Sequence, residues 1–249
     1  MKIYAMTKKG VCKNENEDRI IVNNSVISEG YYEFDVNGAV IAIADGVVGS
    51  NAGVAASNFL AVHLAKCNHE DIDINMFKDI NSELITKSIS EVSLNNMATT
   101  LSGISIKNIT AKLFHVGNTR INIMQESYLK QLTDDHTTVN WLVKVGKMTA
   151  KDAVKYDKRN EITACFGGGN KNLINQMVFI DNCIEIEYAH KIIITSDGIH
   201  EYLSLDELEA FLNERINMDK ICETIIDKAT QNGSQDDRSI IIILKNEGG

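Results

Sequence analysis

Short runs of apolar and β-branched residues, separated by polar turns, dominate this chain of 249 residues. Runs of four to eight such residues, or apolar and polar residues in alternation, are typical of β-strands. They predict strands over Ile3–Thr7, Ile20–Asn23, Ala39–Ala44, Thr99–Ile106, Ile109–Val116, Thr119–Gln125, Glu185–Tyr188, Lys191–Thr195 and Arg238–Leu244. The break at Lys107-Asn108 indicates a hairpin between two of these strands.

Other segments carry apolar residues at the spacing of an amphipathic helix. They are Ala52–Lys66, Ile74–Leu94, Val139–Val145, Ala150–Tyr156, Leu205–Asn213 and Met218–Gln231. In the third of these, Trp141 is expected on the packed face. Because the helices are grouped and do not alternate regularly with the strands, the order favours an α+β fold with mainly antiparallel sheets. No linker or change of composition divides the chain, so we expect residues 1–249 to form a single domain.

Composition narrows the class of protein. The formal charge of −9 argues against a nucleic-acid or anionic-membrane binder, which needs a basic face. The longest apolar runs, Ala39–Ala44 and Ile240–Leu244, are far shorter than the roughly 18 residues of a membrane helix. The N-terminus lacks the apolar stretch of a signal peptide, and the five scattered cysteines suit free thiols in a reducing compartment. We therefore expect a cytoplasmic protein without a membrane partner.

Acidic residues lie at the ends of four predicted strands. Asp45 and Asp197 each follow an apolar strand and precede a glycine, whereas Glu17-Asp18 and Asp236-Asp237 each precede a strand. Since antiparallel neighbours bring the end of one strand beside the start of the next, all four sites can gather on one rim of a sheet. Crowded carboxylates raise one another's pKa unless a cation neutralises them, and Mg²⁺ or Mn²⁺ takes oxygen ligands. Each Asp-Gly pair alone is explained equally well as a simple turn; the four sites together favour a metal centre.

The order of these motifs resembles that of the metal-dependent protein phosphatases (type 2C, or PPM). The motifs are Asn16-Glu17-Asp18, Ala44-Asp45-Gly46, Ala98-Thr99-Thr100, Gly117-Asn118-Thr119-Arg120, Ser196-Asp197-Gly198 and Asp236-Asp237-Arg238-Ser239. The stretch from Leu132 to Gly167 is similar to the flap region of the bacterial members. The resemblance covers nearly the whole chain. It implies a four-layer αββα sandwich of two mainly antiparallel β-sheets flanked by helices, with a flap at about residues 136–172.

The resemblance also implies a site for two Mn²⁺ or Mg²⁺ ions. By position, Asp45 would bridge both ions, the carbonyl of Gly46 would bind the first, and Asp197 and Asp236 would complete the second. Glu17 and Asp18 would act near the site, largely through metal-bound waters. Asp236 is assigned by its place in the motif, and Asp237 remains the alternative ligand. A hydroxide that bridges the two ions would then attack the phosphorus of a phosphoserine or phosphothreonine in line.

Two residues depart from the family pattern. Lys13 stands where the family usually has an arginine that grips the substrate phosphate, and a lysine cannot make the same bidentate contact. As a catalytic residue, Lys13 should therefore bind phosphate more weakly; as an alternative, it is an ordinary solvated surface lysine. Asn118 replaces the family's aspartate that helps to hold a third ion, so the third metal should be weak or absent.

The function implied by the resemblance is that of a metal-dependent phosphoprotein phosphatase. Its partners would be phosphorylated protein substrates and a counteracting Ser/Thr kinase. The alternative, motivated by Lys13 and Asn118, is a catalytically weak or inactive regulatory module of the same fold that binds a phosphorylated partner.

Overall fold

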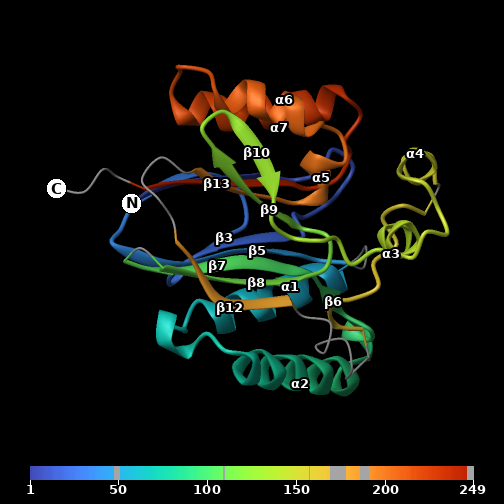
Figure 1. The fold of residues 1–249 in the computed structure, drawn as a ribbon. Helices are drawn as coiled ribbons and strands as arrows, with labels where there is room; N and C mark the ends of the chain where they lie inside the picture. The colour runs from blue at the N-terminus through green and yellow to red at the C-terminus, as the bar shows by residue number, and fades with distance from the viewer. Residues whose placement is uncertain (48–50, 109, 157, 169–177, 186–190, 246–249) are drawn as a thin grey trace.

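Two six-stranded antiparallel sheets form the centre of the computed structural model, which describes all residues except 48–50, 109, 157, 169–177, 186–190 and 246–249 (Figure 1). The first sheet has the order β10-β9-β13-β14-β1-β4 and the second β12-β8-β7-β5-β2-β3. The first sheet comprises β1 (Lys2–Lys8), β4 (Gly30–Asp35), β9 (Arg120–Gln125), β10 (Tyr128–Gln131), β13 (Lys191–Thr195) and β14 (Arg238–Leu244). The second comprises β2 (Asp18–Val22), β3 (Ser25–Ile27), β5 (Gly38–Asp45), β7 (Leu101–Lys107), β8 (Thr110–Val116) and β12 (Val178–Glu185).

Helices cover the outer face of each sheet, so that four layers result (Figure 1). The first sheet is covered by α6 (Leu205–Leu212) and α7 (Met218–Gln231), and the second by α1 (Asn51–Leu64) and α2 (Ile74–Ser90). The short α5 (Asp197–His200) follows β13, and the one-turn helices η1 (His69–Asp71) and η2 (Val92–Leu94) flank α2. The predicted α+β class and the αββα sandwich are confirmed.

The packing of β14 shows why its sequence is a run of four isoleucines. Ile241 and Ile243 point between the sheets, whereas Ile240 and Ile242 pack under α6 and α7. Successive side chains of a strand point to opposite faces, so a strand that is covered on both faces is apolar at every position. The same reason explains the isoleucines of β13.

The chain segment between β10 and β12 extends out of the sandwich. It carries α3 (Thr138–Lys144), α4 (Ala150–Ala153) and β11 (Phe166–Gly167), which pairs with β6 (Ala98–Thr99). Figure 1 shows α3 and α4 projecting from one end of the two sheets. These helices and β11 fall within the segment 136–172 for which we expect a flap, and we call this segment the flap below; residues 157 and 169–172 lie outside the described part of the chain. None of the helices in the described ranges is long and apolar enough to cross a membrane.

Several elements differ from the predicted ones. The predicted helix Ile74–Leu94 ends as an α-helix at Ser90, and the expected strand Thr99–Ile106 is broken between β6 and β7. Trp141 is not packed as expected: its side chain is 53% exposed. Of the predicted strand Glu185–Tyr188, only Glu185 is described, as the last residue of β12. The sequence pattern missed β3, β4, β10 and β11, which are short or lie at sheet edges.

Candidate metal centre

The predicted acidic residues meet at the end of the sandwich from which the flap projects. They come from both sheets: Asp45 ends β5 and Asp18 begins β2 in the second sheet, whereas Asp197 follows β13 and Asp236 precedes β14 in the first. The prediction of a single sheet rim is therefore wrong in this detail. Four apolar strands that look alike in the sequence belong to two stacked sheets, and the carboxylates line the gap between them.

A cleft of about 290 Å³ joins these residues. Its lining includes both predicted metal-site and flap residues: Lys13, Glu17, Asp45, Gly46, Val47, Thr100, Asn118, Asn160, Ile162, Asp197 and Asp236. Of the six predicted metal-site residues, only Asp18 is absent from this lining, because it lies beneath the floor at 1% exposure. The structure thus brings together the residues that the motifs singled out.

Asp45 and Asp18 face each other across neighbouring strands, as Cα partners in the β2–β5 register. Burial, followed by repulsion from Asp237, raises the pKa of Asp18 to about 8. Burial, followed by repulsion from Asp18 and Asp197, also raises the pKa of Asp45 well above its ordinary value. The Ser239 hydroxyl, 2.6 Å from the Asp18 carboxylate, donates a hydrogen bond to it. Carboxylates held this close together favour a cation between them.

Asp197 has a partner that the sequence did not reveal. The side-chain amide of Asn118 donates a hydrogen bond to the Asp197 carboxylate at 2.9 Å. Burial and the charge of Asp236 nevertheless raise the pKa of Asp197 to about 6. Asn118 was expected to matter only through its neutral oxygen. Its amide nitrogen fixes the orientation of Asp197, a role that an aspartate could not fill without a cation between the two carboxylates.

Close backbone approaches explain the glycines of the two Asp-Gly pairs. A Cβ on Gly46 would lie 2.5 Å from the carbonyl oxygen of Gly53 in α1, and a Cβ on Gly198 would overlap the carbonyl oxygen of Asp237. Each glycine therefore lets a neighbouring segment pack directly beside the aspartate before it. A turn alone would not require this closeness.

Asp236 and Asp237 have different surroundings. The Asp237 side chain is only 2% exposed and accepts hydrogen bonds from the backbone N–H groups of Gly10 at 2.7 Å and Glu17 at 2.8 Å. The Asp236 side chain is 46% exposed and faces the cleft. Asp237 is thus occupied in holding the N-terminal segment, whereas Asp236 is accessible to a ligand.

Lys13 is embedded among carboxylates. Its ammonium group lies 2.8 Å from Glu17, 2.5 Å from Asp236 and 2.9 Å from Asp237. Burial alone would lower the pKa of Lys13, but hydrogen bonds to these three carboxylates raise it above its ordinary value. The alternative of a solvated surface lysine is therefore wrong. Lys13 supplies positive charge at the place where the carboxylates are most crowded.

The donor set fits hard divalent ions in its chemistry, since every side chain that could bind an ion in the cleft offers oxygen. As the side chains stand, no three His, Cys, Asp or Glu residues of the described part are arranged to hold an ion. The contacts of Lys13 account for part of this, because Asp236 and Glu17 point their oxygens at its ammonium. Binding of an ion would require these two carboxylates to turn away from Lys13.

Partly buried polar contacts lie where the flap meets the rest of the protein. Arg120 makes a two-pronged contact with Asp135 at 2.6–3.0 Å, and Arg159 of the flap pairs with Glu201 at 2.7 Å. The ring of His136 accepts a hydrogen bond from the backbone N–H of Gly117 at 3.1 Å. These side chains therefore have structural contacts in the folded chain.

The chain is similar in sequence to named bacterial phosphatases. No family model matches it. It is 25% identical over 252 residues to the serine/threonine phosphatase Stp of Listeria welshimeri, covering 96% of this chain and 94% of the relative. It is 27% identical over 256 residues to the protein phosphatase PhpP of Streptococcus pneumoniae, covering 99% and 98%.

The fold is also similar to that of a solved phosphatase structure. The catalytic domain of the serine/threonine protein phosphatase PstP, in complex with two manganese ions, superimposes with a TM-score of 0.76 at 21% identity. The alignment covers 97% of this chain and 98% of that one. Sequence and fold are therefore both shared from one end of the chain to the other.

Proposed function

We propose that this chain, a homologue of the bacterial serine/threonine phosphatases of type 2C, hydrolyses phosphoserine and phosphothreonine in proteins with the help of two divalent metal ions. The observation that carries the proposal is the cleft in which Asp45, Asp197 and Asp236 converge from two sheets. Support also comes from relatives that are named as phosphatases and match the chain over almost its full length, and from the two manganese ions bound to PstP.

In this proposal, Asp45 would contribute to the sites of both ions, and Asp197 and Asp236 would contribute to the site of the second. The carbonyl of Gly46 contributes to the site of the first, and Glu17 and Asp18 hold water near the ions. Bound Mn²⁺ or Mg²⁺ would supply an activated water as the nucleophile and would neutralise the phosphate. A third ion would bind weakly or not at all, because Asn118 offers no carboxylate.

The chain's own residues orient the site. Asn118 holds the Asp197 carboxylate in one rotamer through its amide hydrogen bond, and Ser239 does the same for Asp18. Asp237 fixes the backbone of Gly10 and Glu17, and with it the position of Lys13. The ammonium group of Lys13, which lines the cleft and pairs with Glu17 and Asp236, would contact the substrate phosphate when these two carboxylates turn toward the ions.

The alternative of an inactive module that binds a phosphorylated partner is not favoured. The relatives with the same fold are named as phosphatases, and all proposed ligands are present. We further propose phosphorylated proteins as substrates, an opposing Ser/Thr kinase and a cytoplasmic location.

Hydrolysis of p-nitrophenyl phosphate tests the proposal. The protein should turn this ester over in the presence of Mn²⁺ and lose activity when EDTA is added. Asp45→Ala and Asp197→Ala should each lower kcat by about 10³-fold or more, since each removes a ligand that positions the nucleophile. Lys8→Ala is a suitable control, because Lys8 makes only an exposed ion pair with Asp227. Metal-independent turnover, or full activity of Asp45→Ala, would refute the proposal.

A further inference from the structure

The flap differs in charge from the rest of the chain. Residues 136–172 contain seven Lys and Arg against three Asp and Glu, a net charge of +4, whereas the remaining residues contain 18 against 31, a net charge of −13. A basic segment in an acidic protein attracts anions at that place while the rest of the surface repels them.

Part of this positive charge is free to act on a partner. Five lysines, here called the flap lysines, are all exposed: Lys144, Lys147, Lys151, Lys155 and Lys158. Lys144 pairs with Asp134 at 2.9 Å, and Lys147 lies over the ring of Trp141. Lys151, Lys155 and Lys158 make no ion pair with another side chain among the described residues. Their charge is not neutralised within that part of the protein.

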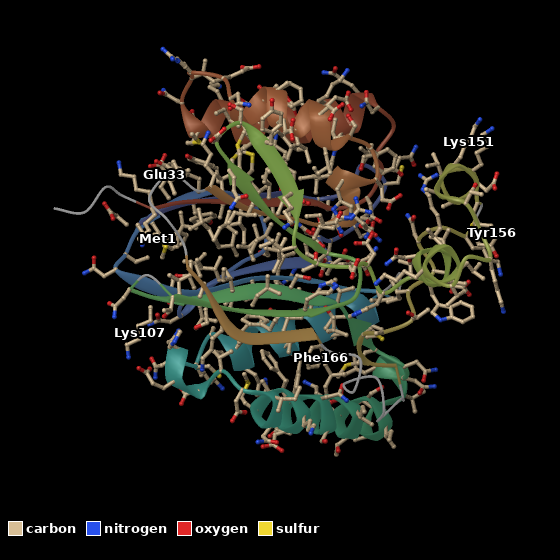
Figure 2. The ribbon with its side chains drawn as sticks, viewed as in Figure 1. Met1, Glu33, Lys107, Lys151, Tyr156 and Phe166 are labelled. Carbon is tan, nitrogen blue, oxygen red and sulfur yellow. The ribbon has the colours of Figure 1, made fainter. Side chains whose placement is uncertain are left out.

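One of the flap lysines, Lys158, lies beside the metal cleft. Lys158, Arg159, Asn160 and Glu161 line a hollow of about 380 Å³, and Asn160 also lines the metal cleft. Figure 2 shows Lys151 and Tyr156 on the part of the flap that projects furthest from the sheets. A peptide that leaves the cleft on the side of the flap would therefore pass Lys158, and Lys151 lies further out on the flap.

An exposed apolar surface accompanies these charges. The side chain of Trp141 is 53% exposed, and Val145 and Val154 are also exposed. Exposed apolar patches often mark surfaces that bind other proteins, and aromatic side chains are enriched there. The flap thus has both features of a contact surface.

We propose that the flap lysines bind acidic side chains that flank the phosphorylated residue of a protein substrate, so that the enzyme prefers phosphorylation sites in acidic sequences. The proposal deepens the phosphatase function stated above and rests on it. Arg159 is not part of the surface, because Glu201 already neutralises it. Exposed ion pairs are individually weak, so several lysines must act together to give a useful preference.

Two phosphothreonine peptides of equal length test this proposal, one with Asp and Glu around the phosphothreonine and one with Asn and Gln at the same positions. With the wild-type protein and Mn²⁺, kcat/KM should be about eightfold higher for the acidic peptide, corresponding to roughly a factor of two for each of the three unpaired lysines. The preference should shrink as NaCl is raised, because salt screens exposed charges.

The variant Lys151→Gln/Lys155→Gln/Lys158→Gln should reduce the ratio between the two peptides to about one. The matched control Lys66→Gln/Lys78→Gln/Lys220→Gln removes three exposed lysines that lie outside the flap, after α1 and in α2 and α7, and should keep the wild-type ratio. Because the readout is a ratio, a loss of folded protein lowers both rates and leaves it unchanged. An unchanged ratio in the flap variant, or an equal loss of preference in the control, would overturn the proposal.

The two proposals can fail separately. If wild-type protein does not hydrolyse p-nitrophenyl phosphate with Mn²⁺, the phosphatase function fails. The flap is then tested by the fluorescence anisotropy of the same two peptides, labelled and mixed with wild-type protein and both variants. Tighter binding of the acidic peptide that disappears only in the flap variant supports the surface, and equal binding of the two peptides overturns it.

Discussion

The cleft and the flap are neighbours, but they are built in opposite ways. The carboxylates of the cleft stand at the ends of long strands and are held by hydrogen bonds from Asn118, Ser239 and backbone amides. The flap carries two helices, α3 and α4, of seven and four residues and exposes most of its charged side chains. One region is acidic and buried, and the other is basic and exposed. If the proposed roles hold, the difference predicts that mutations in the cleft and in the flap alter the chemistry and the recognition of substrate separately.

The largest expected difference concerns stability. Asp237→Asn should lower the free energy of unfolding by about 3 kcal/mol, because it removes the buried charge that pairs with Lys13 and the amides of Gly10 and Glu17. Asp236→Asn should change it by less than about 1 kcal/mol but should weaken Mn²⁺ binding. Urea unfolding of the metal-free proteins and calorimetric titration with Mn²⁺ measure the two effects.

Substitution of flap lysines is the control for the two aspartate variants, because removing an exposed charge should change the free energy of unfolding by less than about 0.5 kcal/mol. If Asp236→Asn were as destabilising as Asp237→Asn, the distinction between a structural and an accessible carboxylate would be wrong.

A lower pH should destabilise the protein through His115, which contacts His136 at the start of the flap. Burial, and then the charge of His136, lowers the pKa of His115 to about 4, and its ring is stacked on that of His136. When the pKa of a histidine is lower in the folded state than in the unfolded chain, the unfolded chain takes up the proton first. The folded protein therefore becomes less stable as the pH falls through the unfolded pKa of about 6.5. Between pH 7.5 and pH 5, this amounts to about 2 kcal/mol for His115.

Thermal or urea unfolding at the two pH values measures this effect. His115→Gln should retain the hydrogen-bonding capacity and lose about 2 kcal/mol less on acidification than wild type. An identical loss in both proteins would show that His115 does not control the acid sensitivity.

Asn118→Asp should act within the cleft only. It replaces the amide donor to Asp197 by a second carboxylate, so the metal-free protein should lose about 1 kcal/mol of stability. Saturating Mn²⁺ should stabilise the variant more than the wild type, and calorimetry should detect additional ion binding. If rate, metal dependence and stability all stayed as in the wild type, the role assigned to Asn118 would be incorrect.

Lys13→Arg should have the smallest effect. An arginine can make a two-pronged contact with phosphate, so KM for p-nitrophenyl phosphate should fall by about two- to fivefold at saturating Mn²⁺. The preference between acidic and neutral peptides should not change, since that preference belongs to the flap. An unchanged or raised KM in a folded variant would contradict the expected contact with phosphate.

The sequence predicts the centre of this protein better than its edges. The isoleucine runs of β13 and β14 and the aspartates that bound them are visible because both faces of these strands are buried. Strand β4 was missed because its residues are largely exposed and mix aromatic with acidic side chains, as suits the edge of a sheet. Which strands share a sheet depends on pairing between distant segments, and periodicity carries no signal for it.

The same limit applies within the cleft. Motif order identified Asp45, Asp197 and Asp236, because short local patterns mark the ends of strands. The three carboxylate partners of Lys13 and the bond from Asn118 to Asp197 depend on side chains that meet only in the folded chain. The exposure of Trp141 was missed because helical periodicity shows an apolar face but not whether another element covers it.

Strands β1 and β14 pair along seven residues each, and the pair of Lys13 with Asp237 joins positions 224 apart in sequence. Contacts of such long range form late, since the chain between them must first be ordered. A growing polypeptide therefore has Asp18 and Asp45 long before it has Asp236 or Asp237. During synthesis β1 can pair only with β4 until β14 has been made, so the cleft cannot be completed before the last strand is added.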